Sequence, residues 1–185
     1  MKTVLVCNQK GGVGKTLISD EIAFALDRAN VSYNFYDLDG QGGCIHEQKE
    51  SESSDYCIVD TPGALQKEML DWMKSVDVII IPTRMTSRDI PPLQTMLELV
   101  QNKDVKAKVI VVLNGWNRFT ATNDFEEWFK EEYPNLNTVT VPQSEIFTQS
   151  ALAGKSVVEF KPRSMASDQI KLLTGLVKYE LGIKQ

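Results

Sequence analysis

Short apolar runs of strand length alternate along this chain with segments in which apolar residues recur at helical spacing. Two of the runs, residues 76–82 and 109–113, contain almost no polar residue, which is typical of strands that are covered on both faces. The segments that we predict to be strands are residues 3–7, 32–37, 56–60, 76–82, 109–113 and 138–141.

Helical segments lie between these strands. Ile18, Ile22, Ala25 and Ala29 recur at spacings of three and four residues, and similar stripes occupy residues 90–100, 125–133 and 170–181. Alternating strands and helices are typical of βαβ units. The sequence therefore predicts one α/β domain over residues 1–185, with a doubly wound, mostly parallel sheet and helices on both faces.

The composition limits the possible functions. The chain has 185 residues, 42% of them hydrophobic, and its formal net charge of −5 is unlike that of proteins that grip nucleic acid over a whole surface. Any DNA contact must come from a local patch or from assembly. No apolar run approaches the roughly 18 residues of a membrane span, and the three cysteines form no CxxC pair. We therefore expect a cytoplasmic protein.

The first predicted strand runs into a glycine-rich turn, QKGGVGKT at residues 9–16, and a helix follows. This is the context of a phosphate-binding loop, in which glycines let backbone N–H groups surround the phosphates. Lys15 is expected to reach the β- and γ-phosphates, and the hydroxyl of Thr16 to bind Mg²⁺. The residues that we expect to bind nucleotide here are Lys10, Gly11, Gly12, Val13, Gly14, Lys15, Thr16 and Leu17.

Acidic residues follow the next two strands. Asp37 and Asp39 come at the end of the second strand, and Asp60 ends the third, as in a Walker B segment. The carboxyl ends of strands in a doubly wound sheet face the ligand crevice. A carboxylate there can bind a Mg²⁺-coordinated water or orient the attacking water. The alternative for Asp37 and Asp39 is a simple turn after a strand.

The segment KGGVGKT resembles the deviant Walker A sequence of the ParA/MinD family of P-loop ATPases, in which the extra lysine is the signature. The resemblance implies that two subunits sandwich two nucleotides and that Lys10 reaches the partner's phosphates. Lys10 and Lys15 would then both be catalytic. Residues 37–42 are similar to the family's D-x-D-P-Q-G element, whose second Asp activates the hydrolytic water. This implies a catalytic role for Asp39 and a metal site of Thr16, Asp39 and Asp60, although Gly40 replaces the proline.

The fifth strand leads into Asn114-Gly115-Trp116-Asn117, where a GTPase usually carries N-K-x-D. The missing aspartate favours adenine over guanine. The resemblance assigns the adenine pocket to Asn114, Pro142 and Gln143. The alternative for Asn114 is a helix or turn cap.

The resemblance covers most of the chain and implies a ParA-like ATPase with ATP and Mg²⁺, acting as a dimerisation switch in plasmid or chromosome partition. The ATP-bound homodimer would bind non-specific DNA and so associate with the nucleoid, because two weak patches add their phosphate contacts. A centromere-binding, ParB-like partner would stimulate its slow hydrolysis. The basic residues that could contact DNA are Lys155, Lys161, Arg163, Lys171 and Lys178.

Three alternatives stay open. The first is a MinD-like positioning ATPase on a membrane or a protein scaffold, although no polybasic cluster accompanies the last helix and we expect no membrane binding. The second is a P-loop metabolic ligase, for which no acceptor pocket is identifiable. The third is a module that binds nucleotide without useful hydrolysis, consistent with Gly40 and Leu17. His46, the sole histidine, is expected at the surface rather than in a metal site.

Overall fold

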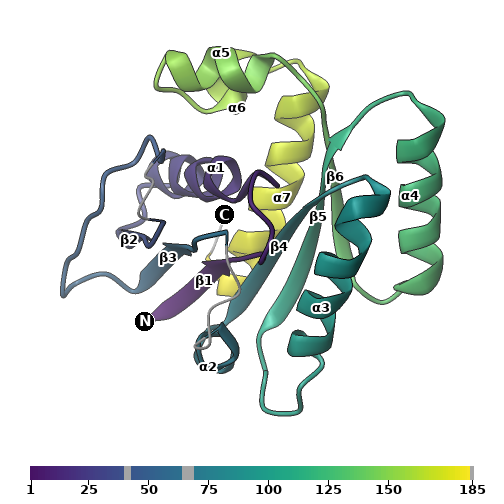
Figure 1. The fold of residues 1–185 in the computed structure, drawn as a ribbon. Coiled ribbons are helices and arrows are strands. Elements are labelled where there is room, and N and C mark those ends of the chain that lie inside the picture. Colours follow the sequence, from purple (N-terminus) through teal and green to yellow (C-terminus); the bar gives the residue numbers. More distant parts are fainter. Residues whose placement is uncertain (40–42, 64–68, 184–185) are drawn as a thin grey trace.

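Six parallel strands form one sheet in the order β2-β3-β1-β4-β5-β6, which confirms the predicted α/β architecture. The computed structural model describes residues 1–39, 43–63 and 69–183. Figure 1 shows the sheet between two layers of helices. The strands are β1 (Lys2–Val6), β2 (Tyr33–Asp37), β3 (Tyr56–Asp60), β4 (Val78–Arg84), β5 (Lys108–Trp116) and β6 (Asn137–Pro142).

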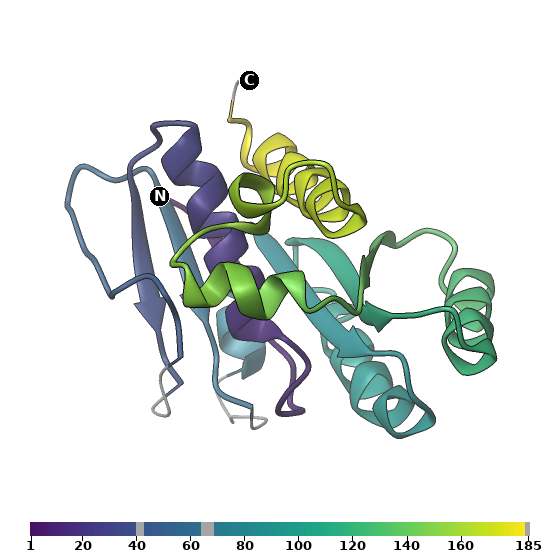
Figure 2. The ribbon, with the colours of Figure 1, turned by 90° about the horizontal axis from the view of Figure 1, so that it is seen from above.

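Helices cover both faces of the sheet. α1 and α7 pack on one face, and α2, α3 and α4 lie on the other (Figures 1 and 2). The helical elements are α1 (Lys15–Arg28), α2 (Met69–Ser75), the short η1 (Ser87–Asp89), α3 (Ile90–Val100), α4 (Thr120–Glu132), α5 (Ile146–Leu152), α6 (Val157–Phe160) and α7 (Met165–Leu181). Within the described ranges, no helix combines the length and the apolar character needed to cross a bilayer.

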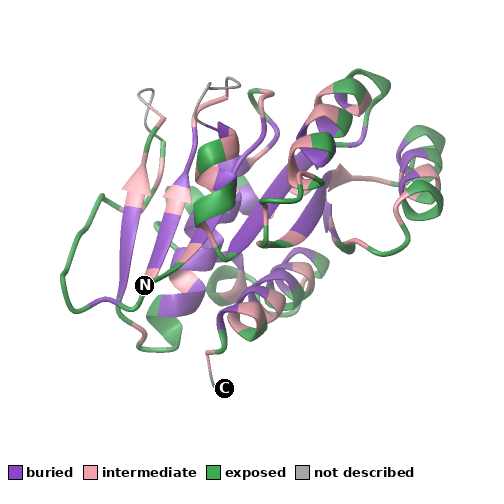
Figure 3. Ribbon diagram, turned by 90° about the horizontal axis from the view of Figure 1, so that it is seen from below, coloured by how far each residue is buried: buried purple, intermediate pink, exposed green. Residues whose placement is uncertain are grey.

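Alternating side chains of each central strand enter two separate cores. Val4 and Val6 of β1 pack toward α1 and α7, whereas Leu5 packs toward the helices of the opposite face. In β4, residues 78–81 are all fully buried, as the uninterrupted apolar sequence predicts. Figure 3 shows the same pattern, with buried residues along the strands and on the inward faces of the helices.

The sequence pattern predicts the strands and the long helices but not the short helices. The predicted strand at residues 109–113 extends in the structure from Lys108 to Trp116, with an irregularity of register between Asn114 and Trp116. α2, α5 and α6 have seven, seven and four residues, too few for a repeating apolar stripe to stand out. These short helices are held by tertiary contacts.

One such contact joins α1 to α6. The carboxylate of Glu21, which is 2% exposed, accepts hydrogen bonds from Ser156 Oγ at 2.5 Å and from the backbone N–H of Val157 at 2.9 Å. In Figure 2 the segment of α5 and α6 lies across α1. Burial raises the pKa of Glu21, and the two hydrogen bonds partly oppose that rise. Glu21 therefore fixes the chain that follows β6 onto the helix that follows the phosphate loop.

We expect Glu21→Ala to lower the free energy of unfolding by about 2–3 kcal/mol, because Ser156 and Val157 lose a buried acceptor. Glu21→Gln keeps one acceptor oxygen and should cost less. The raised pKa means that the folded protein binds this proton more tightly than the unfolded chain. Wild-type stability should therefore fall as pH rises through that pKa, and Glu21→Gln should flatten the fall. Urea unfolding over a pH series measures both effects, and equal losses for the two variants would contradict the assignment.

Candidate nucleotide-binding site

The predicted phosphate loop connects the carboxyl end of β1 to the first turn of α1. Gly12 and Gly14 have φ angles of 72° and 101°, in the left-handed region that favours glycine. A Cβ atom at Gly14 would also lie 2.3 Å from Nδ2 of Asn114. The backbone can therefore fold inward at this point only with glycine, as a phosphate-binding loop requires.

The side chain of Lys15 lies inside this loop. It is 6% exposed, and its Nζ donates a hydrogen bond to the carbonyl oxygen of Lys10 at 3.3 Å. Burial lowers the pKa of Lys15, while Asp60, Asp39 and Cys7 act in the opposite direction. The ammonium is thus placed among negative groups beneath a glycine-rich turn, where phosphate oxygens can replace the Lys10 carbonyl.

Asp60 ends β3 directly opposite the start of α1. Its Oδ2 accepts a hydrogen bond from Thr16 Oγ1 at 2.9 Å, and the residue is fully buried. Oδ1 makes no hydrogen bond of regular geometry with any described residue. Burial raises the pKa of Asp60, and Asp37 raises it further, whereas Thr16, Ser19 and Cys44 lower it. A buried carboxylate beside a hydroxyl is an oxygen donor set that fits Mg²⁺.

The two aspartates after β2 differ in their surroundings. Asp37, Cys44 and Asp60 offer ligand atoms that all lie within 4.8 Å of one another. Asp39 is not part of this group; its backbone N–H donates to Asp37 Oδ1 at 2.9 Å, and its charge acts on Lys15. The structure therefore brings Asp37 to Asp60 and Cys44, while the charge of Asp39 acts on Lys15. Gly40, Gln41 and Gly42 of the same element fall outside the described residues.

The signature lysine is bound within its own chain. Nζ of Lys10 lies 2.6 Å from Asp89 Oδ1 and donates to the Arg88 carbonyl at 3.3 Å. Asp89 is 2% exposed, and its second oxygen accepts a hydrogen bond from Thr86 Oγ1. The sequence gives no signal for this pairing, because Asp89 lies 79 positions further along the chain in a single turn of 3₁₀ helix.

A cavity of about 420 Å³ lies beside the phosphate loop, at the carboxyl ends of β5 and β6. Its lining includes all three residues that the resemblance assigns to the adenine pocket, Asn114, Pro142 and Gln143, and also Leu17 from the end of the loop. Asn114 Nδ2 donates to the Val13 carbonyl at 2.8 Å, so this side chain connects the cavity to the loop. Arg84, for which the sequence gives no signal, also lines the cavity and donates from Nε to the Gly12 carbonyl at 3.2 Å.

The side chain of His46 is more buried than the surface position that we expect from the sequence. Its side chain is 12% exposed, with Nδ1 2.8 Å from Asp20 and Nε2 3.2 Å from Asp27. The ring packs edge-on against Phe24 at 4.3 Å. Asp20 also accepts the backbone N–H groups of Ile45 and His46. These contacts hold residues 45–46, which follow β2 along the chain, against α1.

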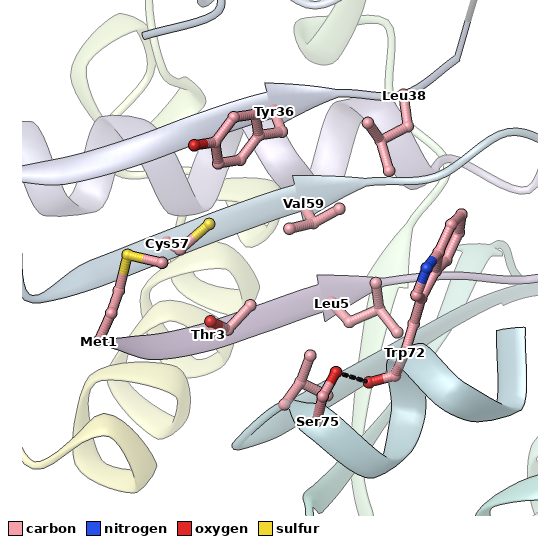
Figure 4. Close-up of a pocket in the computed structure, with 10 residues that line it drawn as sticks. Met1, Thr3, Leu5, Tyr36, Leu38, Cys57, Val59, Trp72 and Ser75 are labelled. Atoms are coloured by element: carbon pink, nitrogen blue, oxygen red, sulfur yellow. Dashed lines mark hydrogen bonds between the residues drawn. The ribbon is translucent and has the colours of Figure 1, made fainter. Parts of the chain in front are cut away.

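A second hollow, of about 310 Å³, lies on the other face of the sheet, between β1, β2, β3 and α2 (Figure 4). Among the described residues, its lining includes none of the predicted site residues and no charged side chain. Its lining is Met1, Thr3, Leu5, Tyr36, Leu38, Cys57, Val59, Trp72, Ser75 and Val76. Such a lining does not fit a triphosphate.

We expect Gly14→Ala to weaken nucleotide binding by at least about tenfold, or 1.4 kcal/mol. The new methyl group would strain the backbone and displace the Asn114 amide, which deforms the loop and the base cavity together. Gly154→Ala is the matched control, because Gly154 also has a positive φ, 62°, but no atom within 4 Å of its would-be Cβ. Titration with a fluorescent ATP analogue checks the prediction; equal affinities for the two variants would refute it.

Comparison with known proteins agrees with this geometry. The sequence profile of the CobQ/CobB/MinD/ParA nucleotide binding domain, CbiA, matches residues 4–157. A search of curated protein sequences found no significant match.

Solved structures with low sequence identity share the fold. An Asp-to-Ala variant of Cyanothece McdA in complex with ATP has a TM-score of 0.80 at 18% identity, covering 100% of this chain and 98% of its own. MinD of Aquifex aeolicus has a TM-score of 0.75 at 15% identity, covering 97% of each chain. A plasmid partition protein of Borrelia burgdorferi bound to AMPPNP has 0.67 at 14% identity, covering 96% of this chain and 99% of its own. By the profile match, the chain belongs to the CobQ/CobB/MinD/ParA nucleotide-binding family.

Proposed function

From this family membership, we propose that the chain is a ParA-like ATPase that uses ATP as a dimerisation switch in plasmid or chromosome partition. The observation that carries the proposal is the second lysine of the loop, Lys10, which lies outside the phosphate cradle and is paired with Asp89 in the single chain. A lysine needed for its own nucleotide would lie inside the loop, as Lys15 does. The AMPPNP-bound plasmid partition protein and the ATP-bound McdA variant, which share the fold, support the choice of nucleotide.

In this proposal the loop and the neighbouring strand ends bind different parts of the nucleotide. Backbone N–H groups of residues 11–14 and the ammonium of Lys15 bind the phosphates, and the N-terminus of α1 adds its partial positive charge. Leu17, Asn114, Pro142 and Gln143 enclose the base in the 420 Å³ cavity. Thr16 and Asp60 would hold Mg²⁺, which supplies charge neutralisation at the β- and γ-phosphates when bound.

Hydrolysis needs a water in line with the γ-phosphate, and little covalent chemistry from the protein. We assign Asp39 to accept a hydrogen bond from that water, because its charge lies near Lys15 and hence near the phosphate position. Asp37 supports this arrangement through its hydrogen bond from the Asp39 N–H. A centromere-binding, ParB-like partner protein would accelerate the reaction.

Because Lys10 is paired with Asp89, the Asp89 carboxylate and the partner subunit's triphosphate would compete for its ammonium on dimerisation. In the monomer Lys10 binds Asp89; in the dimer it would bind the triphosphate of the partner subunit. Because ATP stabilises only the second arrangement, nucleotide binding and dimerisation favour each other reciprocally.

We expect Lys10→Ala to retain much of its ATP binding but to remain monomeric with ATP. Asp89→Asn should dimerise up to about thirtyfold more readily than wild type, since each dimer breaks two partly exposed ion pairs, each worth up to about 1 kcal/mol. Sedimentation velocity with ADP, ATP and a non-hydrolysable analogue measures both. Lys106→Ala, at an exposed lysine on the loop before β5, is the control. An ATP-dependent dimer of Lys10→Ala would remove the shared-site mechanism.

DNA binding is the step that distinguishes partition on the nucleoid from positioning on a protein scaffold. Four of the five candidate basic residues are exposed, and the fifth, Lys178, is half-buried. They lie in the segments around α6 and on α7. The ammonium of Lys171 already has partners within the chain, because its Nζ lies 3.5 Å from Asp168 and donates to the Pro162 carbonyl.

We expect the ATP state, but not the ADP state, to co-sediment with non-specific duplex DNA, with an affinity that falls steeply as salt rises. The double variant Lys161→Glu, Arg163→Glu should reduce the slope of log K against log salt by about 0.9 for each phosphate that the variant no longer neutralises. Lys106→Glu should leave the slope unchanged. Absence of DNA binding in the ATP dimer would instead favour the alternative role of positioning on a protein scaffold.

A further inference from the structure

A thiol lies in the cation site of this chain. Cys44 Sγ is 3.5 Å from Asp60 Oδ2, the same oxygen that accepts the hydrogen bond of Thr16. With Asp37, these residues offer one sulfur and two carboxylate ligands within 4.8 Å of one another. Mg²⁺ prefers oxygen ligands, whereas sulfur selects softer ions such as Zn²⁺.

The spacing is close to that of a tetrahedral zinc site. Zn–S and Zn–O bonds of about 2.3 and 2.0 Å place neighbouring ligand atoms about 3.3–3.8 Å apart. The pair formed by Cys44 and Asp60 already has this separation. A carboxylate oxygen of Asp37 lies within 4.8 Å of both atoms, so a shift of up to about 1.5 Å would close the group around an ion.

Two further features favour a built site over a chance cluster. Asp60 is fully buried, and its Oδ1 has no regular hydrogen bond among the described residues. Cys44 is fixed by the chain that follows it, because the buried carboxylate of Asp20 accepts the N–H groups of Ile45 and His46. The thiol is therefore held against Asp60 independently of any nucleotide.

We propose that Asp37, Cys44 and Asp60 bind a thiophilic divalent cation, of which Zn²⁺ is the type, in the nucleotide-free protein. The fourth position of the tetrahedron is taken by water, and the thiol proton passes to solvent as the metal–sulfur bond forms. A consequence, which rests on the proposed function, is competition: Zn²⁺ and Mg²⁺-ATP both require Asp60, so Zn²⁺ would hold the enzyme in its nucleotide-free state.

Co²⁺ added to the nucleotide-free protein is the direct probe, because a cobalt–thiolate bond gives an ultraviolet charge-transfer band that oxygen ligands do not give. We expect the band in wild type and in Cys57→Ser, whose thiol lies in the separate hollow of Figure 4. Cys44→Ser should lose the band, and Asp37→Asn should weaken Co²⁺ binding at least tenfold. Zn²⁺ should displace Co²⁺ and bleach the band.

Absence of the band in wild type, or its survival in Cys44→Ser, would overturn the site. Circular dichroism of each variant shows whether a missing band reflects a failure to fold, and Asp37→Asn provides a second test that leaves the thiol in place. The measurement uses no nucleotide, whereas Mg²⁺-dependent ATP binding is measured on the same wild-type protein without Co²⁺. The two proposals can thus fail separately. Persistence of the band in the presence of bound Mg²⁺-ATP would overturn the competition.

Discussion

The parallel register of the sheet is the constraint from which the site follows. Because all six strands run in the same direction, their carboxyl ends meet at one edge, where the loop and the site side chains gather. Asp60 pairs in register with Val6, the last residue of β1 before the phosphate loop, and Asn114 pairs with Arg84. The loop, the carboxylates and the cavity lined by Asn114 are therefore placed together by backbone hydrogen bonds.

The site residues that the sequence predicts are those that lie at or directly after the end of a strand. The loop glycines, Lys15, Asp60 and Asn114 each follow a recognisable strand, so the pattern is enough to bring them to one edge. Asp89, Arg84 and the cluster around His46 were missed, because each depends on a partner far along the chain. The sequence does not predict the positions of α2, α5 and α6 for the same reason. Contacts such as that of Glu21 with α6 determine where these short helices lie, and no local periodicity reveals such contacts.

The site combines a rigid half with an adjustable half. Gly14, Asn114 and Arg84 fix the loop by close contacts and hydrogen bonds that leave little freedom. Lys10 is paired with a carboxylate that it would leave in the proposed dimer, and the ligands around Asp60 would accept a second kind of cation in the proposed zinc site. Binding energy from a nucleotide can therefore be used to move Lys10 without disturbing the cradle that holds the phosphates, which is what a switch between two assemblies requires.

The most direct test is a crystal structure of the protein with Mg²⁺ and a non-hydrolysable ATP analogue. We expect a two-subunit sandwich in which Nζ of Lys10 has left Asp89 and contacts the triphosphate held by the Lys15 loop of the other subunit. A nucleotide-loaded structure in which Lys10 still pairs with Asp89 of its own chain, with no neighbouring phosphate within hydrogen-bonding distance, would contradict it.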